Sequence, residues 1–155
     1  MSRINISRIR KRKGSRYPAP YAAPCAKRER KPLGNAAGLT DFGVNLLRLP
    51  SGTWSSQRHW HDSEDEFIYV LSGAVVMITD KDETVLEPGD CAGFPKNRAD
   101  GHHLVNRSSE DAIVLEIGSR HRKDITIYPD IDLKYDPAAG GYVRKNGKPV
   151  PKKKA

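Results

Sequence analysis

Residues 52–73 read GTWSSQRHWHDSEDEFIYVLSG and combine two histidines, an acidic turn and an apolar run. Residues i and i+2 of a strand point to the same face, so His59 and His61 are predicted to present two imidazoles side by side. The acidic turn then leads into a second predicted strand, which begins at Glu66. The stretch therefore predicts two adjacent nitrogen donors with a carboxylate returning beside them.

A second pair of histidines, His102 and His103, lies on a later predicted strand. Alternation places His102 on one face of that strand and His103 on the other, so one of the two can supply a third imidazole. Three nitrogens and one oxygen form a borderline donor set that suits Fe, Mn, Ni, Co, Cu or Zn. We therefore expect one divalent metal ion per chain.

The rest of the chain shows short apolar runs separated by turn signals, without helical periodicity or an internal repeat. Ser72 and Gly73 have the composition of a hairpin turn, and residues 88–90 (Pro-Gly-Asp) are another strong turn signal. Regular short strands of this kind predict an all-β sandwich or barrel. The expected strands are residues 42–49, 53–61, 66–71, 74–79, 84–87, 91–94, 102–106, 112–117 and 125–128.

Charge is divided unevenly along the chain. Residues 1–31 carry eleven Lys and Arg against one acid, and residues 144–155 carry six with no acid. The residues between them have a net charge of −8, so the overall charge of +8 comes from the two ends. The sequence thus predicts a basic, Pro-rich and partly disordered N-terminal arm (1–31), a β-barrel domain (32–143) and a basic C-terminal tail (144–155).

The two basic ends raise the question of nucleic-acid binding. Their charge could hold phosphates non-specifically, and Tyr17 and Tyr21 could stack on bases. We favour the simpler interpretation that the ends solubilise the protein or fold back onto its acidic body, so nucleic acid is not an expected partner. The Tyr/Pro/Ala segment of the arm could lie extended across a neighbouring surface.

Chain length and cysteine content further narrow the class of protein and its cellular compartment. A chain of 155 residues accommodates one domain with a real core. Its apolar runs are too short for a membrane span, and its basic start lacks the apolar segment of a secretory signal. An organelle transit peptide is the alternative for that start. The two cysteines, Cys25 and Cys91, cannot form a disulfide framework, and we expect both to be reduced in a cytoplasmic protein.

Several predicted strands are apolar on both faces, for example residues 67–71 and 112–115. A single sandwich in water should alternate more cleanly. We therefore expect the outer face of one sheet to pack on a second subunit or on the Pro-rich arm, and a homodimer is the default.

The residues that carry this chemistry resemble the first motif of the cupin superfamily. That motif has a Gly, then His-x-His, then Glu and a final Gly, and the order is matched by Gly52, His59, His61, Glu66 and Gly73. Six residues separate the first Gly from the first His, where the family has five. Because this difference lies in a loop before the ligands, we interpret it as a tolerated insertion.

The second cupin motif is also present, as Gly89, Pro95, His102 and Asn106. Six residues separate the Pro from the His where the family has four, and Asn97 replaces the internal Gly. The His-x3-Asn spacing of the motif fits His102 and not His103.

This resemblance covers about residues 40–118. Within the superfamily, the chain is most similar to small, single-domain bacterial cupins. It implies a cupin-type double-stranded β-helix, or jelly-roll barrel, that is commonly dimeric. It also implies a divalent metal held by His59, His61, Glu66 and His102. His103 would then lie behind the site or on the surface. His121 is predicted to lie in an exposed loop.

Further residues near the motif are weaker candidates. If the two motif histidines point inward, strand alternation turns Gln57 inward too, as a contact for a bound ligand or as a rim amide. Glu64 and Asp65 flank Glu66 and could act as a base or be solvated turn residues.

Four protein ligands on an octahedral metal leave two positions for a chelating substrate, or for substrate and dioxygen together. A chelated hydroxy-carbonyl group would predict an isomerase of sugar or sugar-phosphate type, and iron with oxygen would predict a dioxygenase. The sequence has no clear phosphate-binding loop, so the phosphate comes from family analogy alone. The alternative is a binding or sensing module in which the metal anchors a small ligand.

Overall fold

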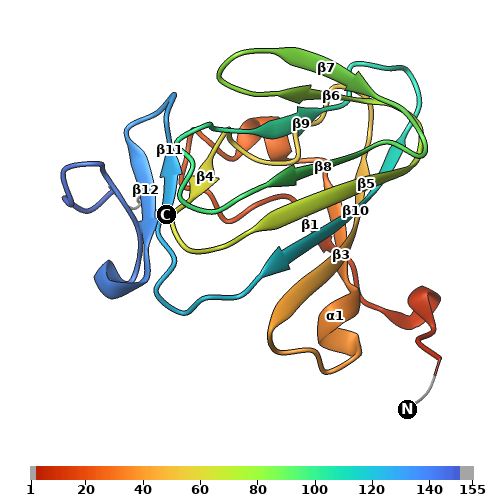
Figure 1. The fold of residues 1–155 in the computed structure, drawn as a ribbon, viewed down its shortest axis with the longest axis horizontal. Helices are drawn as coiled ribbons and strands as arrows, with labels where there is room; N and C mark the ends of the chain where they lie inside the picture. Colours follow the sequence, from red (N-terminus) through yellow and green to blue (C-terminus); the bar gives the residue numbers. More distant parts are fainter. Residues whose placement is uncertain (1–2, 151–155) are drawn as a thin grey trace.

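The computed structural model describes residues 3–150 and shows a molecule built almost entirely of β-strands (Figure 1). The strands are β1 (Arg12–Lys13), β2 (Glu29–Pro32), β3 (Phe42–Leu49), β4 (Trp60–His61), β5 (Glu66–Ser72), β6 (Val75–Ile78), β7 (Glu83–Leu86), β8 (Cys91–Phe94), β9 (His103–Val105), β10 (Ala112–Ser119), β11 (Thr126–Tyr128), β12 (Leu133–Asp136) and β13 (Gly141–Val143). The helical segments in this part of the chain are one short helix, α1 (Leu33–Ala36), and three 3₁₀ turns, η1 (Ile6–Arg8), η2 (Ala23–Cys25) and η3 (Pro137–Ala139).

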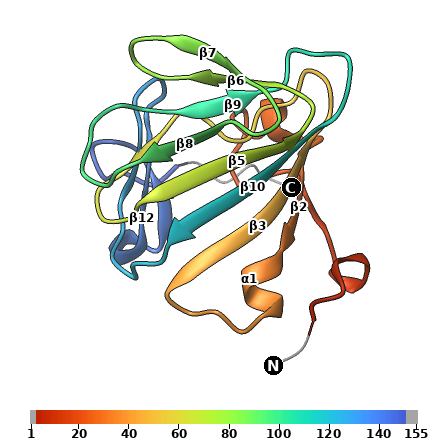
Figure 2. The ribbon, with the colours of Figure 1, turned by 45° about the vertical axis from the view of Figure 1, so that its right-hand side comes forward.

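The largest sheet has six strands in the order β1-β2-β3-β10-β5-β8, and its longer strands run side by side in Figure 2. β3 and β10 pair antiparallel along eight residues. Val114 of β10 lies opposite Leu47 of β3 on one side and Val70 of β5 on the other. All three side chains are fully buried, so this cross-strand row begins the core.

A three-stranded sheet, β7-β6-β9, covers this row and completes the core. Burial of each such aliphatic side chain stabilises the fold by roughly 1.5–3 kcal/mol. The core cluster consists of Leu47, Leu49, Ile68, Val70, Val75, Leu86, Leu104, Ala112 and Val114.

A four-stranded sheet, β13-β12-β11-β4, completes the architecture beside the end of the large sheet where β5 begins (Figure 1). The predicted all-β, jelly-roll class is confirmed, although the three sheets do not join into one continuous barrel. Among residues 3–150, no helix has the length and apolar character needed to cross a membrane.

Two local predictions are wrong. Residues 53–61 do not form one strand: β4 covers Trp60 and His61 alone, and bends and isolated bridges precede it. The Ser72-Gly73 turn is not a hairpin, because β5 and β6 belong to different sheets. Gly73 has a φ of +70°, and a Cβ there would lie 2.4 Å from the carbonyl oxygen of Asp111. The motif glycine therefore permits a close approach to the backbone before β10, at the point where the chain leaves the large sheet.

The N-terminal arm is integrated into the large sheet. β2 pairs antiparallel with β3, and β1 pairs with β2 at the sheet edge. The boundary expected between residues 31 and 32 falls inside β2, so the end of the arm is the second strand of the sheet, between β1 and β3. At the other end, residues 144–148 form a turn closed by a bond from Arg144 N to Lys148 O at 2.8 Å. The division into arm, domain and tail stays a prediction, and its residues 1–2 and 151–155 lie outside the described part.

The apolar character of both faces of β5 has a direct structural counterpart. Ile68 and Val70 point into the core, whereas Phe67, Tyr69 and Leu71 are 40, 39 and 46% exposed. The outer face of the large sheet therefore presents an open row of large apolar side chains.

Candidate metal centre

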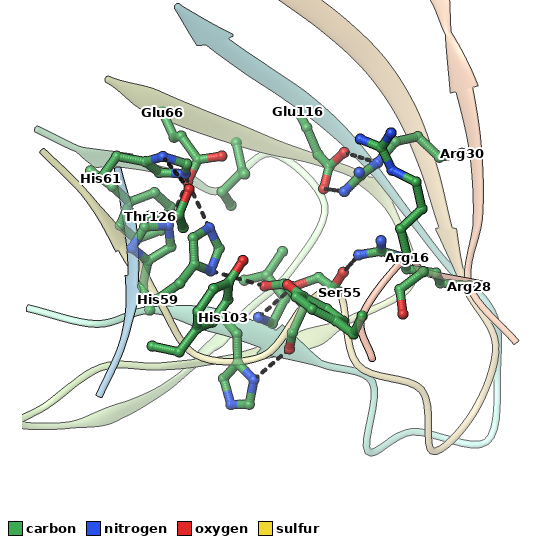
Figure 3. Close-up of a pocket in the computed structure, with 18 of the residues that line it drawn as sticks. Arg16, Arg28, Arg30, Ser55, His59, His61, Glu66, His103, Glu116 and Thr126 are labelled. Atoms are coloured by element: carbon green, nitrogen blue, oxygen red, sulfur yellow. Dashed lines mark hydrogen bonds and ion pairs between the residues drawn. The ribbon is translucent and has the colours of Figure 1, made fainter. Parts of the chain in front are cut away.

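Three imidazoles converge on one carboxylate oxygen. The Nε2 atoms of His102, His59 and His61 lie 2.8, 3.3 and 3.5 Å from Oε2 of Glu66. All three imidazoles are largely buried, and Figure 3 shows His59, His61 and Glu66 together at one end of a cavity. The structure thus brings together the four residues that the sequence singled out as metal ligands.

Backbone pairing explains how residues so far apart in sequence meet. His59 and His102 form an isolated antiparallel bridge, with N···O distances of 3.1 and 2.8 Å between their backbones. His61 lies on β4 opposite Thr126 of β11. Glu66 begins β5 opposite Phe94 of β8, whose ring stacks on the ring of His102 with centroids 3.6 Å apart.

Hydrogen bonds on the far side of two rings determine which nitrogen carries the proton. His59 Nδ1 lies 2.9 Å from the carbonyl oxygen of Gln57, and His61 Nδ1 lies 2.6 Å from Oδ2 of Asp124. A carbonyl or carboxylate oxygen only accepts, so both Nδ1 atoms donate. Each neutral ring then turns an Nε2 lone pair toward Glu66, where two acceptors face each other unless a proton or a cation lies between them. This donor arrangement fits a metal ion.

The same geometry governs the proton affinity of the cluster. Burial acts against the charged form of His61, but its hydrogen bonds to Asp124 and Glu66 raise its pKa to about 10. Burial likewise opposes ionisation of Glu66, yet the bonds from His102, His59 and His61 hold its pKa well below the usual value. Positive charge between these groups is therefore strongly favoured, whether as protons or as a metal cation.

The adjacent histidines 102 and 103 have different surroundings. His103 points away from the cluster: its Nδ1 lies 3.0 Å from the carbonyl oxygen of Ser56, and its ring meets Trp54 edge-on. His102 Nδ1 is buried and has no hydrogen-bond partner among the described residues. The imidazole of His102 is thus fixed by its contacts with Phe94 and Glu66.

The weaker sequence candidates lie outside the cluster. Gln57 does not line the cavity: it is buried, and its Nε2 donates to the carbonyl oxygen of Tyr21 at 2.7 Å. Strand alternation fails there because the residues before β4 form bends. Glu64 accepts a hydrogen bond from the backbone of His121, an exposed loop residue, at 2.5 Å. Asp65 accepts one from Lys96 N at 2.8 Å. These bonds hold loops around the site.

The sequence reasoning missed Asp124. Its carboxylate binds His61, accepts from Ser63 N at 3.0 Å and from Thr126 Oγ1 at 3.3 Å, and is almost completely buried. Although burial raises the pKa of Asp124, the hydrogen bond with His61 lowers it below the usual value. Asp124 also forms a possible ligand group with His61 and Glu64, but its bond to the far side of His61 suits orientation of that ring. Asp124 belongs to no recognised sequence motif. It directly precedes a predicted strand, and no other sequence feature points to it.

The cluster opens into a cavity of about 650 Å³, within the usual range for small-molecule sites. Glu66 and Glu116 are the carboxylates on its wall, while Tyr128 lies beside His59 with ring centroids 5.9 Å apart. The end away from the histidines is lined by arm residues 12–17 and by Arg28 and Arg30 (Figure 3).

The chain is similar to known cupins. Residues 45–118 match the model of the cupin domain family. A sugar phosphate isomerase of the cupin superfamily from Silicibacter pomeroyi is 40% identical, with 97% of each chain covered and a TM-score of 0.90. A candidate sugar phosphate isomerase from Acidithiobacillus ferrooxidans is 35% identical, with 79% of this chain and 74% of that chain covered and a TM-score of 0.68.

More distant matches agree on the fold alone. A polyketide cyclase from Streptomyces resistomycificus is 16% identical, with 77% of this chain and 79% of that chain covered and a TM-score of 0.61. No match is found among curated protein sequences. The two cupin motifs, the jelly-roll sheets, the family-model match and the full-length likeness to the Silicibacter pomeroyi protein agree, and the chain belongs to the cupin superfamily.

Proposed function

We propose that this chain is a metal-dependent isomerase that interconverts the aldose and ketose forms of a small sugar phosphate. One divalent metal ion per chain would be held by His59, His61, Glu66 and His102. The observation that carries the proposal is the convergence of three Nε2 atoms on Glu66 Oε2 at the end of an open cavity. The name of the Silicibacter pomeroyi protein, 40% identical over 97% of the chain, supports the substrate class.

A metal at this site would polarise the oxygens of a chelated hydroxy-carbonyl group and acidify the hydroxyl-bearing carbon next to the carbonyl. The chain itself must then move a proton between neighbouring carbons. Glu66 is engaged by the three imidazoles, and Glu116, in an ion pair with Arg30, is the other carboxylate on the cavity wall. Arg30 holds Glu116 through two contacts of 2.7 and 2.8 Å. We assign Glu116 the proton transfer.

The test is turnover of a panel of aldose and ketose phosphates by the protein loaded in turn with each candidate metal, followed by proton NMR. Interconversion in at least one metal form, abolished by a chelator, is the expected result. Glu116→Gln should retain the metal and lose turnover. No interconversion in any metal form would overturn the proposal. Oxygen uptake with Fe(II) would instead indicate a dioxygenase, and binding without turnover would indicate a sensing module.

We also propose that the chain is a homodimer in the cytoplasm, as the sequence suggests. The exposed row Phe67, Tyr69 and Leu71 gives a second copy an apolar face to cover, and a two-fold axis would bring the same row from both copies together. Sedimentation should give twice the mass of one chain, and Tyr69→Glu should give a monomer. A monomeric wild type would exclude the dimer.

Both cysteines are free, as a reducing compartment requires.

A further inference from the structure

The end of the cavity away from the histidines has a strongly basic wall. All of its cations come from the arm: Arg12, Lys13 and Arg16 lie in β1 and just after it, and Arg28 and Arg30 lie just before β2 and in it. Figure 3 shows Arg16, Arg28 and Arg30 gathered opposite His59, His61 and Glu66. The cavity therefore has two chemically different ends.

Backbone hydrogen bonds hold the arm in this position. Gly14 N donates to the carbonyl oxygen of Arg28 at 2.9 Å, and Arg28 Nε donates to the carbonyl oxygen of Gly14 at 2.9 Å. The same guanidinium also donates to the carbonyl oxygen of Ser55, which lies on the cavity wall. Arg12 faces Arg30 across the pairing of β1 and β2. Arg28 is thus held within the fold, and the pairing of β1 with β2 fixes the backbone that carries the exposed side chains of Arg12 and Lys13.

Among the described residues, carboxylates neutralise only one cation of this wall. Glu116 pairs with Arg30, but no ion pair among residues 3–150 includes Arg12, Lys13, Arg16 or Arg28. Arg28 is only 9% exposed, and burial, followed by the nearby charge of Arg30, lowers its pKa. A buried cation without an opposite charge is costly, and two carbonyl oxygens offset only part of that cost.

Neutral hydrogen-bond donors lie on the same wall. The Ser15 hydroxyl is buried and has no partner among the described residues. Burial, with a smaller effect of the neighbouring Tyr142, raises the pKa of Tyr17, so its phenol keeps its proton. Tyr142 also lines the cavity, and burial raises its pKa too. These hydroxyls add donors beside the cations.

We propose that Arg12, Lys13, Ser15, Arg16 and Arg28 form the binding subsite for the phosphate group of the substrate. The proposal rests on the isomerase function above and deepens it by placing the phosphate at the arm and the sugar carbons near the histidines. A phosphate monoester offers three terminal oxygens, which match guanidinium groups and a hydroxyl donor. Neutral sugars would leave the wall unpaired and should bind poorly.

The experiment titrates inorganic phosphate into the full-length, chelator-treated protein by isothermal calorimetry at fixed low salt. The variant Arg12→Gln/Arg16→Gln removes two cations from the wall. The matched variant Arg8→Gln/Arg10→Gln removes the same charge from exposed arm residues that do not line the cavity. We expect the first variant to weaken phosphate binding by about tenfold or more, and the matched variant by about twofold or less.

The outcomes separate this proposal from the isomerase function. Phosphate binding that both variants weaken equally, or that neither weakens, would overturn the subsite even if isomerisation is found. Selective loss in the first variant without isomerisation would uphold the subsite and remove the isomerase. Where the enzyme turns over, the first variant should raise KM for the sugar phosphate with little change in kcat. Stronger competition by a sugar carboxylate than by phosphate would overturn the assignment to phosphate.

Discussion

The two ends of the cavity are built in different ways. At one end, three imidazoles and a carboxylate come from strands and bridges of the jelly roll, and Gln57 O and Asp124 fix two of the rings from behind. At the other end, the cations come from an arm that contributes no residue to the central core cluster. The first end is held by hydrogen bonds behind its rings, whereas the second is a segment paired at a sheet edge.

This difference indicates a division of labour. Rigidly held donors can act on reacting atoms, because small displacements there cost rate. Long arginine side chains, exposed at Arg12 and Arg16 and buried at Arg28, contribute binding energy to a part of the substrate that does not react. Changes at the histidine end should therefore reduce metal content and kcat, and changes at the arm should act mainly on KM.

Loss of a ligand at the histidine end should have the largest effect. Glu66→Ala removes the oxygen on which all three imidazoles converge. Metal affinity should fall by about 100-fold or more and turnover should reach background, because weakening even a supporting contact costs about 10- to 100-fold. Metal analysis of the purified variant checks this. His121→Ala, at an exposed loop, is the control and should keep its metal; undiminished metal in Glu66→Ala would contradict the ligand assignment.

The histidine end could be predicted because its information is local. His59, His61 and Glu66 lie within eight residues and match the His-x-His and Glu order of the first cupin motif. Short apolar runs bounded by turn signals placed β3 at residues 42–49 and β8 at residues 91–94 with the observed bounds. Where alternation breaks into bends, as before β4, the amide of Gln57 bonds to the backbone of Tyr21 and does not line the cavity.

The arm end could not be predicted because its information is not local. Its position depends on pairing of β2 with β3 and of β1 with β2, and neither short strand has an apolar pattern. The basic composition of the arm was visible, but composition does not show which cations line a cavity. Asp124 was missed for the same reason: it is 63 residues from His61 in sequence and meets it through pairing of β4 with β11.

A smaller effect is expected at Asp124, which supports the histidine end without being one of the four proposed ligands. Asp124→Asn preserves the shape of the side chain but removes its negative charge. That charge makes the imidazole of His61 a stronger electron-pair donor to a metal ion. Metal affinity should fall roughly 10- to 100-fold, as for other partners of metal-bound histidines. Competition with a chelator of known affinity measures the change.

Asp65→Asn is the matched control for this change, because Asp65 precedes Glu66 but bonds to Lys96 N and not to an imidazole. Its metal affinity should stay close to that of the wild type. Phosphate binding by metal-free Asp124→Asn should also be unchanged, since Asp124 does not line the cavity. If Asp124→Asn kept its metal but no longer bound phosphate, the two ends of the cavity would be coupled through β11. The division between a chemical end and a binding end would then be wrong.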